Sequence, residues 1–452
     1  MKPSSLEVRK QQELEDALLE ADNIIMKKYM SKISKYEIKE ISSDLESLDL
    51  NTVFRLNKVE KLVFNADENN LEKLMNVYNA VGLCGGSIVN IIISDGKKID
   101  YYIGTRAEDI NGVAACQDTL MSALSGNFQG STIKLQKKGA LNECMEKVFG
   151  EEEKKSITVV SGIPGYRNET NRENKKFVQG IERVIDSMNG KAFALVTISS
   201  LLNSDRMIQI KDAYESLYTQ LSPFAETQLS YNESDSNAVA ETITDGITKT
   251  VGESLSNTLS NSKTETKGTN TSKSFNGSLV LMGISDSNGT NHSTGVQKGT
   301  SKSETTSSSD ADSHSEAKTD TYTNTSGRTL QINIENKAVK NLMNKISDMI
   351  ERIEDSADLG LWNTATYCIS DSSQNSQVLA SSVEAVCRGD KTSVERFAVE
   401  SWTDSRKRKQ VQKYLEKMVH PIVLVKEKNR YLEVNPASLI NGKELVIEAG
   451  LP

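Results

Sequence analysis

Residues Ile88 to Ile103 have the sequence IVNIIISDGKKIDYYI, and this stretch decides the class of fold. The β-branched run Ile88–Ile93 and the second run Ile99–Ile103 each have the length and composition of a strand. Asp95-Gly96 lies between them, and an Asp-Gly pair supplies the positive φ angles of a tight type I′ turn. The stretch therefore predicts a β-hairpin.

Helices and strands alternate on both sides of this hairpin. Apolar residues spaced three and four apart predict helices, and short β-branched runs predict strands. The order helix–strand–helix occurs twice, which predicts an α/β (α+β) fold with a mixed sheet. The elements predicted in this way are helices over 14–25, 71–81, 114–124, 177–188, 210–221, 339–353 and 379–386, and strands over 133–135, 157–160, 193–198, 364–369, 422–425 and 431–434.

Residues 231–328 differ in composition, being rich in Ser and Thr and poor in large apolar side chains. Burial there could not offset an ordering cost of roughly 1–2 kcal/mol per residue, so we expect most of this segment to be mobile. Because helix–strand–helix order resumes after it, we interpret it as an insertion into one domain. The predicted organisation is an N-terminal helical segment over 1–49, an α/β subdomain with the hairpin over 50–165, a second α/β subdomain over 166–230 and 329–418, the insertion, and a connector over 419–452.

Two parts of the insertion keep apolar residues. One set recurs every four residues, as a helix that leaves the domain would require. The other begins an apolar island over 275–282. We predict partner contacts at Ile243, Ile247, Val251, Leu255, Leu259 and Phe275.

The overall charge is acidic, with a formal net charge of −8 among 452 residues. Such a balance argues against wholesale electrostatic binding of nucleic acid. The one basic run is Arg406, Lys407, Arg408 and Lys409. We interpret it as the solvated face of a helix that buries Val411 and Leu415, and contact with nucleic-acid phosphates is the alternative.

The sequence lacks an apolar run of the roughly 18–20 residues that cross a bilayer. Five scattered cysteines without a C-x-x-C pair suit reduced thiols. We therefore expect a cytoplasmic protein, with association to the inner face of the membrane through partners also compatible.

The chemistry of common active sites is not recognisable in the sequence. A P-loop needs G-x-x-x-x-G-K-[ST] between a strand and a helix, and that pattern is missing. None of the three histidines has a partner at zinc-ligand spacing. We predict no catalytic, cofactor-binding or metal site here, and no small-molecule ligand. An enzyme whose active-site residues are scattered along the chain remains an alternative.

Several short stretches resemble the region ahead of the motor in bacterial HerA/FtsK-like ATPases, close to the conjugative type IV secretion ATPases of the TraC kind. The resemblance covers most of residues 50–452, as a succession of short strings. The stretches are Tyr101-Tyr102-Ile103-Gly104 with Arg106, Leu120 with Ala123-Leu124, Gly126 to Ser131, Phe177 to Glu182 with the following strand, the Ser/Thr-rich insertion, Gly360-Leu361-Trp362 with 364–369, and Ser438 to Leu445 with Gly450-Leu451-Pro452.

The resemblance implies a non-catalytic accessory region that sits on a hexameric, ATP-dependent translocase of DNA or protein. The motor with its Walker motifs lies outside this sequence, so ATP and Mg²⁺ are expected only there. The chain stops straight after a segment of folded character, and we expect the gene to continue into the motor. The alternative from the residues alone is a stand-alone scaffold protein that uses its Ser/Thr-rich arm to bind a partner.

Overall fold

The computed structural model describes residues 27–65, 68–150, 155–165, 179–228, 304–305, 316–318, 333–335, 337–357, 359–389, 395–427 and 430–449. The predicted helix over 14–25 and most of the predicted insertion lie outside these residues. The chain divides into two compact units. The sheet unit contains the described residues between 27 and 207 and from 353 onward, and the hairpin unit contains those between 208 and 352.

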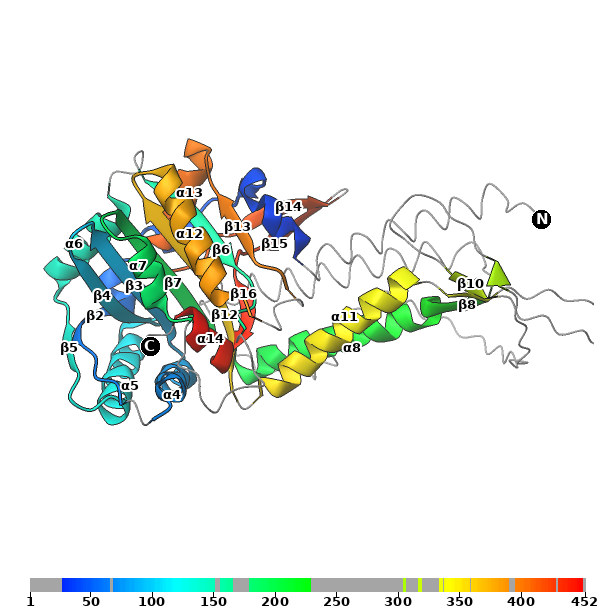
Figure 1. Cartoon of the computed structure of the whole chain (residues 1–452), viewed down its shortest axis with the longest axis horizontal. Helices are drawn as coiled ribbons and strands as arrows, with labels where there is room; N and C mark the ends of the chain where they lie inside the picture. Colours follow the sequence, from blue (N-terminus) through cyan, green and yellow to red (C-terminus); the bar gives the residue numbers. More distant parts are fainter. Residues whose placement is uncertain are drawn as a thin grey trace, which may run out of the picture. The chain divides into compact units, whose positions relative to one another are not determined.

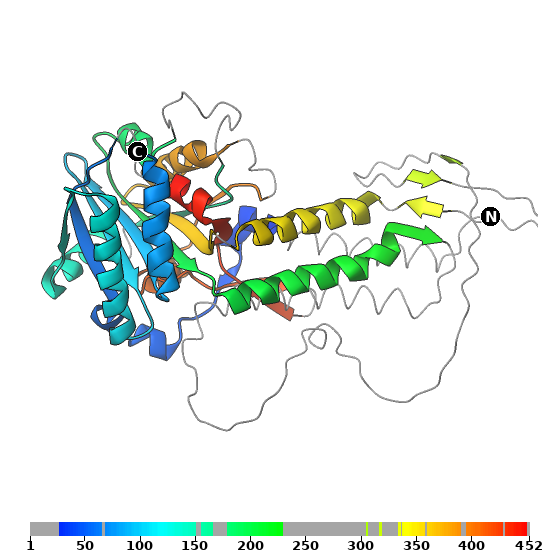
Figure 2. The same cartoon turned by 90° about the horizontal axis from the view of Figure 1, so that it is seen from below.

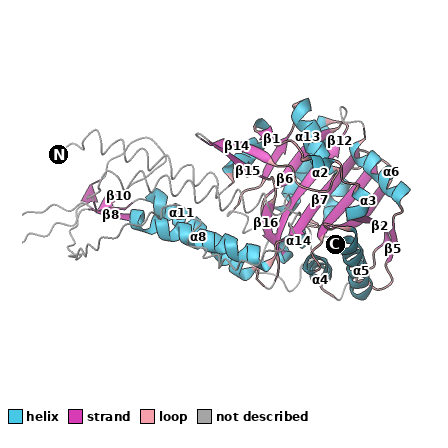
Figure 3. Ribbon diagram, turned by 180° about the vertical axis from the view of Figure 1, so that it is seen from behind, coloured by secondary structure: helices cyan, strands magenta, loops and turns pink. Residues whose placement is uncertain are grey.

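A nine-stranded sheet forms the centre of the sheet unit, in the order β13-β6-β12-β7-β3-β4-β2-β5, with β16 also paired to β12 (Figures 1 and 3). Strands of both predicted α/β subdomains share this sheet. The strands are β2 (Phe54–Lys61), β3 (Ser87–Asp95), β4 (Ile99–Arg106), β5 (Thr132–Leu135), β6 (Ser156–Ser161), β7 (Ala192–Leu201), β12 (Leu361–Ser370), β13 (Ala398–Ser401) and β16 (Ser438–Asn441).

The predicted α+β class is confirmed, but the sheet is not mixed, since its strand pairs in the described residues are all antiparallel. Parallel strands are present without being neighbours. β2 and β3 run the same way with β4 between them, and β6 and β7 run the same way with β12 between them. β4 therefore separates β2 from β3, and β12 separates β6 from β7, so the strands that run the same way do not pair.

The sheet unit is built from two halves with the same βαββαβ order, which is the ferredoxin-like arrangement. The first half runs β2-α4-β3-β4-α5-β5 and the second β6-α7-β7-β12-α12-β13. Each half has the strand order 4-1-3-2, and the halves join where β3 pairs with β7. We call this junction the midline. The helices are α4 (Asn70–Leu83), α5 (Ile110–Asn127), α7 (Ile181–Ser187) and α12 (Ser373–Cys387).

These four helices and α14 (Gly442–Glu448) cover the same face of the sheet (Figure 1). Side chains two and four residues apart on a strand point to one face. On β3, Ile88 contributes to the core under α4 and α5, while Ile92 contributes to the core under α7 and α12. The two apolar clusters therefore adjoin on one face across the midline.

The opposite face is covered by other segments. Tyr102 points to α6 (Lys138–Phe149), where it interacts with Cys144. The 3-10 helix η1 (Lys28–Lys35) reaches Glu400 on β13 through Ser34. The remaining elements of the sheet unit are β1 (Glu37–Ile38), α2 (Ser43–Glu46), α3 (Leu50–Val53), α13 (Ser405–Leu415), β14 (Val423–Glu427) and β15 (Arg430–Val434).

The hairpin that decided the fold class is present as β3 and β4, but its turn is not type I′. A type I′ turn needs positive φ at both central residues. Only Gly96 has it, with φ of 89°, whereas Lys97 is not among the positive-φ residues of the described chain. The Asp95 carboxylate instead accepts the N–H groups of Lys97 at 2.8 Å and Lys98 at 2.7 Å. The Asp95 carboxylate therefore accepts the Lys98 N–H that the Asp95 carbonyl would accept in a hydrogen-bonded β-turn.

The hairpin unit contains most of α8 (Ser204–Ala225) and of α11 (Lys337–Asp355), which lie side by side in Figures 1 to 3. β8 (Glu226–Gln228) pairs antiparallel with β11 (Asn333–Glu335), so the two helices run in opposite directions. Buried residues recur at alternating spacings of three and four, as in a coiled coil. They are Ile210, Tyr214, Leu217 and Leu221 on α8, and Val339, Leu342 and Ile346 on α11. β9 (Glu304–Thr305) and β10 (Glu316–Lys318) complete a small sheet with β8 and β11.

Candidate functional site: the docked connector

The predicted connector over 419–452 contributes strands and a helix to the body of the sheet unit. β14 pairs with β1 and β15, which joins the connector to residues 37–38 near the start of the described chain. β16 then adds to β12, with Ser438 opposite Thr364 and Asn441 opposite Leu361. Backbone pairing fixes the position of these residues more closely than a flexible linker could.

Helix α14 begins at a complete capping box. The Asn441 side chain accepts the backbone N–H of Glu444 at 3.0 Å, and the Glu444 carboxylate accepts the N–H of Asn441 at 2.8 Å. Such reciprocal bonds satisfy donors that a helix start leaves unpaired. Gly442 makes the close approach possible, because a Cβ there would lie 2.4 Å from the Leu359 carbonyl oxygen. The capping box thus sets where α14 begins, and the close contact of Gly442 with Leu359 sets where that start lies on the sheet unit.

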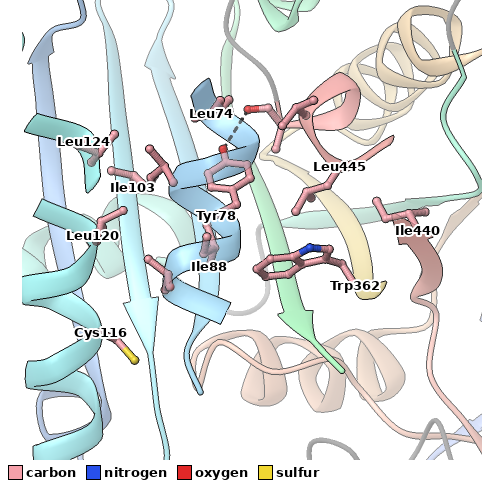
Figure 4. Packing of buried hydrophobic residues seen from close by; sticks show 14 of the residues in the cluster. Leu74, Tyr78, Ile88, Ile103, Cys116, Leu120, Leu124, Trp362, Ile440 and Leu445 are labelled. Atoms are coloured by element: carbon pink, nitrogen blue, oxygen red, sulfur yellow. Dashed lines mark hydrogen bonds between the residues drawn. The ribbon is translucent and has the colours of Figure 1, made fainter. Parts of the chain in front are cut away.

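The apolar side of α14 completes the core beneath α4. Leu445 and Val446 belong to the cluster that contains Tyr78, Trp362 and Ile440, and Figure 4 shows Leu445 facing Tyr78 and Trp362. Full burial of one such aliphatic side chain stabilises by about 1.5–3 kcal/mol. The two residues together supply several kcal/mol for docking, which is comparable with the stability of many domains.

Polar side chains hold the end of α14 beside the midline. Glu448 is 3% exposed, and its Oε1 accepts a hydrogen bond from Thr366 at 2.7 Å. The Thr366 hydroxyl is 2.8 Å from that of Thr197, which lies opposite it on β7. Burial raises the pKa of Glu448 to about 7, since a buried carboxylate loses hydration and the Thr366 hydrogen bond offsets only part of that loss.

A second set of hydrogen bonds reaches the next residue, Ala449. The Tyr78 hydroxyl on α4 donates to the Ala449 carbonyl at 3.3 Å, as drawn in Figure 4. Asn90 lies opposite Thr197 across the midline and donates to the Tyr78 hydroxyl at 3.2 Å. Tyr101 donates to the Asn90 side-chain oxygen at 2.8 Å. We call Tyr78, Asn90, Tyr101, Thr197, Thr366 and Glu448 the midline network.

The space inside the midline network is too small for a substrate. Its cavity measures ≈ 10 Å³ and is lined by residues that include Asn90, Tyr101, Thr197 and Ala449. That is about the room that one water molecule needs. The arrangement can therefore hold a helix end and store a proton on Glu448, but it cannot enclose an organic ligand.

The connector is also anchored on the side where β16 begins. Lys27 is buried and donates to the Ala437 carbonyl at 2.8 Å, while its ammonium lies 3.3 Å from the Glu395 carboxylate. Glu395 in turn accepts a hydrogen bond from Ser438. Lys27, from the start of the described chain, thus meets Glu395 and the beginning of β16.

His420 lies near the start of the connector and contacts Tyr367 on the opposite face of the sheet. It is 2% exposed, and its Nδ1 lies 2.7 Å from the Tyr367 hydroxyl. Burial lowers its pKa to about 4, because the protonated ring would lose hydration there. Arg106, one of the residues quoted for the family resemblance, donates to the Lys417 carbonyl at 3.0 Å. The first contact supports the start of the connector, and the second holds a residue two positions before it.

The basic run of the sequence begins α13, where Asp404 caps the helix. Arg406 forms an ion pair with Glu37 at 2.6 Å, and Lys407 lies 3.6 Å from the same carboxylate and donates to the Lys35 carbonyl at 2.7 Å. Val411 and Leu415 are buried, as the helical interpretation required. Acidic and carbonyl oxygens of residues 35–37 thus engage part of the run, and contact with nucleic acid stays a prediction.

The predicted partner contacts Ile243, Ile247, Val251, Leu255, Leu259 and Phe275 lie outside the described residues. Within the described chain, no group of three or more His, Cys, Asp or Glu side chains is placed to hold a metal ion. No helix in the described ranges is long and apolar enough to cross a membrane. An open depression of ≈ 450 Å³ runs along the outer side of α12.

Sequence patterns missed the residues of the midline network, because its contacts depend on how α4 and α14 pack on β3, β4, β7 and β12. Asn90 carried the one available signal, as a polar residue inside the run IVNIII. No family model matches this chain, and comparison with the curated proteins gave no match either.

Proposed function

We propose that this chain is the non-catalytic accessory region of a HerA/FtsK-like, ATP-dependent translocase of the type IV secretion kind, and that it holds the polypeptide leading to the motor in a fixed position. The observation that carries the proposal is the docking of the connector as a strand and a helix of the sheet unit. In this proposal ATP and Mg²⁺ belong to the motor, which forms the hexamer and handles DNA or protein cargo.

The physical reason is mechanical. A coil of n residues spans about 5–6 Å × √n and leaves its two ends free to wander. A connector that is paired to β12 and buried beneath α4 instead keeps one orientation relative to the sheet. An accessory region that is to position or assemble motor subunits needs such a fixed connection.

The first test is the coding sequence after Pro452, which should reach a P-loop within about a hundred residues. The second is assembly of the full-length protein, measured by mass photometry together with DNA-stimulated ATP turnover. Leu445→Asp places a charge in the core beneath α14, and we expect it to reduce both assembly and turnover at least about tenfold.

The matched control is Leu83→Asp, since Leu83 lies on α4 but is 83% exposed. It should assemble and turn over like the wild type. Thr366→Val, which removes one hydroxyl at the midline, covers the case in which Leu445→Asp does not fold. Equal assembly and turnover in all folded variants, or ATP hydrolysis by the isolated 452-residue chain, would contradict the proposal.

A second candidate function is a scaffold that binds its partner through the Ser/Thr-rich arm. The observation in its favour is the antiparallel pair α8 and α11, whose β8–β11 pairing brackets the chain between 228 and 333. Deletion of residues 231–328 tests it, because Gln228 and Asn333 are already opposite each other and a short loop can join the strands. A scaffold loses its partner in a pull-down while the sheet unit keeps its unfolding temperature; retained binding excludes this role.

A further inference from the structure

Two cysteine thiols meet where the end of α4 packs on α5. Cys84 is the C-terminal cap of α4 and is exposed, whereas Cys116 on α5 is buried. The Cys116 thiol donates to the Cys84 carbonyl at 3.6 Å. Burial, together with the neighbouring Cys84 thiol, raises the pKa of Cys116 to about 12.

The surrounding residues leave space for this pair. Gly85 has φ of 81°, which ends the helix directly after Cys84. A Cβ on Gly86 would lie 2.6 Å from the Cys116 sulfur, so glycine is needed there. The Thr119 hydroxyl, one turn along α5, lies 3.7 Å from the Cys84 sulfur. The exposed thiol is thus held toward α5 instead of extending into solvent.

We propose that Cys84 and Cys116 form a redox-responsive pair. Cys84 reacts with the oxidant, and Cys116 then forms an intramolecular disulfide with the oxidised Cys84. A peroxide oxidises the Cys84 thiol to a sulfenic acid and is reduced to water. The Cys116 thiol then attacks the Cys84 sulfur, the S–S bond forms, the S–O bond breaks, and a second water leaves with the proton of Cys116. A two-electron oxidant of the peroxide class is the only co-reactant.

The disulfide would join the end of α4 to the middle of α5. α4 also carries Tyr78, which binds the Ala449 carbonyl at the end of the connector. Oxidation therefore strengthens the helical layer beneath which α14 docks, by removing freedom from the unfolded chain. This inference concerns the thiols alone and does not depend on the proposed function.

The chain supplies a matched control pair. Cys368 and Cys387 interact with each other inside one apolar cluster, but both are buried. Accessibility of one member therefore distinguishes the Cys84–Cys116 pair from the control pair. Reactivity of a thiol toward oxidants depends on such exposure.

The experiment treats the purified, reduced chain with hydrogen peroxide and maps peptides without reduction. We expect a mass loss of about 2 Da and one cross-linked peptide joining Cys84 to Cys116. Cys84→Ser and Cys116→Ser should each abolish it, while Cys144→Ser should not. Oxidation that ends at the sulfinic acid of Cys84, a Cys84–Cys84 dimer, or equal cross-linking of Cys368 to Cys387 would each overturn the proposal.

Discussion

Glu448 accepts a hydrogen bond from Thr366 at 2.7 Å in the interior of the sheet unit, and this bond ties the last turn of α14 to the middle of β12. The pairing brings together residues that lie 82 positions apart. The carboxyl group accepts this bond from the Thr366 hydroxyl and is almost completely shielded from solvent. Docking of the connector is thereby linked to the protonation of one side chain.

The first prediction follows from the pKa of Glu448, which burial raises from 4.5 to about 7. Its stabilising contribution is complete below pH 4.5 and is lost as the pH rises through about 7, because the folded state holds the proton more tightly. Glu448→Gln should gain stability relative to the wild type over this window, by about 3 kcal/mol. Urea unfolding at pH 4.5 and at pH 8 measures the difference, and a pH-independent difference would refute the assignment.

The second prediction concerns His420, for which the sign is opposite. Burial lowers its pKa from 6.5 to about 4, so its stabilising contribution is present above pH 6.5 and is lost as the pH falls through about 4. His420→Gln should therefore lose less stability than the wild type on acidification. Thermal unfolding of both proteins between pH 4 and pH 7 tests this, and parallel curves would show that His420 titrates normally.

The third prediction concerns the buried pair Lys27 and Glu395, whose side chains are 5% and 4% exposed. Lys27→Met leaves a carboxylate buried without its cation and should cost about 3–5 kcal/mol of unfolding free energy. Lys39→Met is the control, since Lys39 pairs with Glu433 at the surface, and it should cost less than about 1 kcal/mol. Equal losses in denaturant titrations would mean that burial of the first pair does not matter.

The fourth prediction uses two glycines. Gly442→Ala places a Cβ 2.4 Å from the Leu359 carbonyl oxygen, and we expect a loss of about 1–3 kcal/mol with partial undocking of α14. Gly126→Ala meets no atom within 4 Å and should stabilise by about 0.4–1 kcal/mol. Hydrogen exchange over 438–449 reports the undocking, and unchanged protection in Gly442→Ala would argue against a tight contact.

Periodic elements of the chain were predictable because their signals are local. The helix predicted over 71–81 is α4 at Asn70–Leu83, and the strand predicted over 364–369 is β12 at Leu361–Ser370. The helix predicted over 177–188 is described only from Ile181 to Ser187. The short elements β16 and α14 were not predicted, because four and seven residues are too few to show a periodic pattern.

The sequence alone determined the α+β class, the hairpin after Ile88 and the amphipathic faces of α8 and α11, because spacing along the chain sets which side chains share a face. Only the tertiary structure decided that two βαββαβ halves join at the midline, that β4 and β12 separate the parallel strands, and that Glu448 reaches Thr366. Those relationships depend on strand order and on contacts between distant residues. Many strand orders satisfy the same local pattern, and packing of the whole core selects one of them.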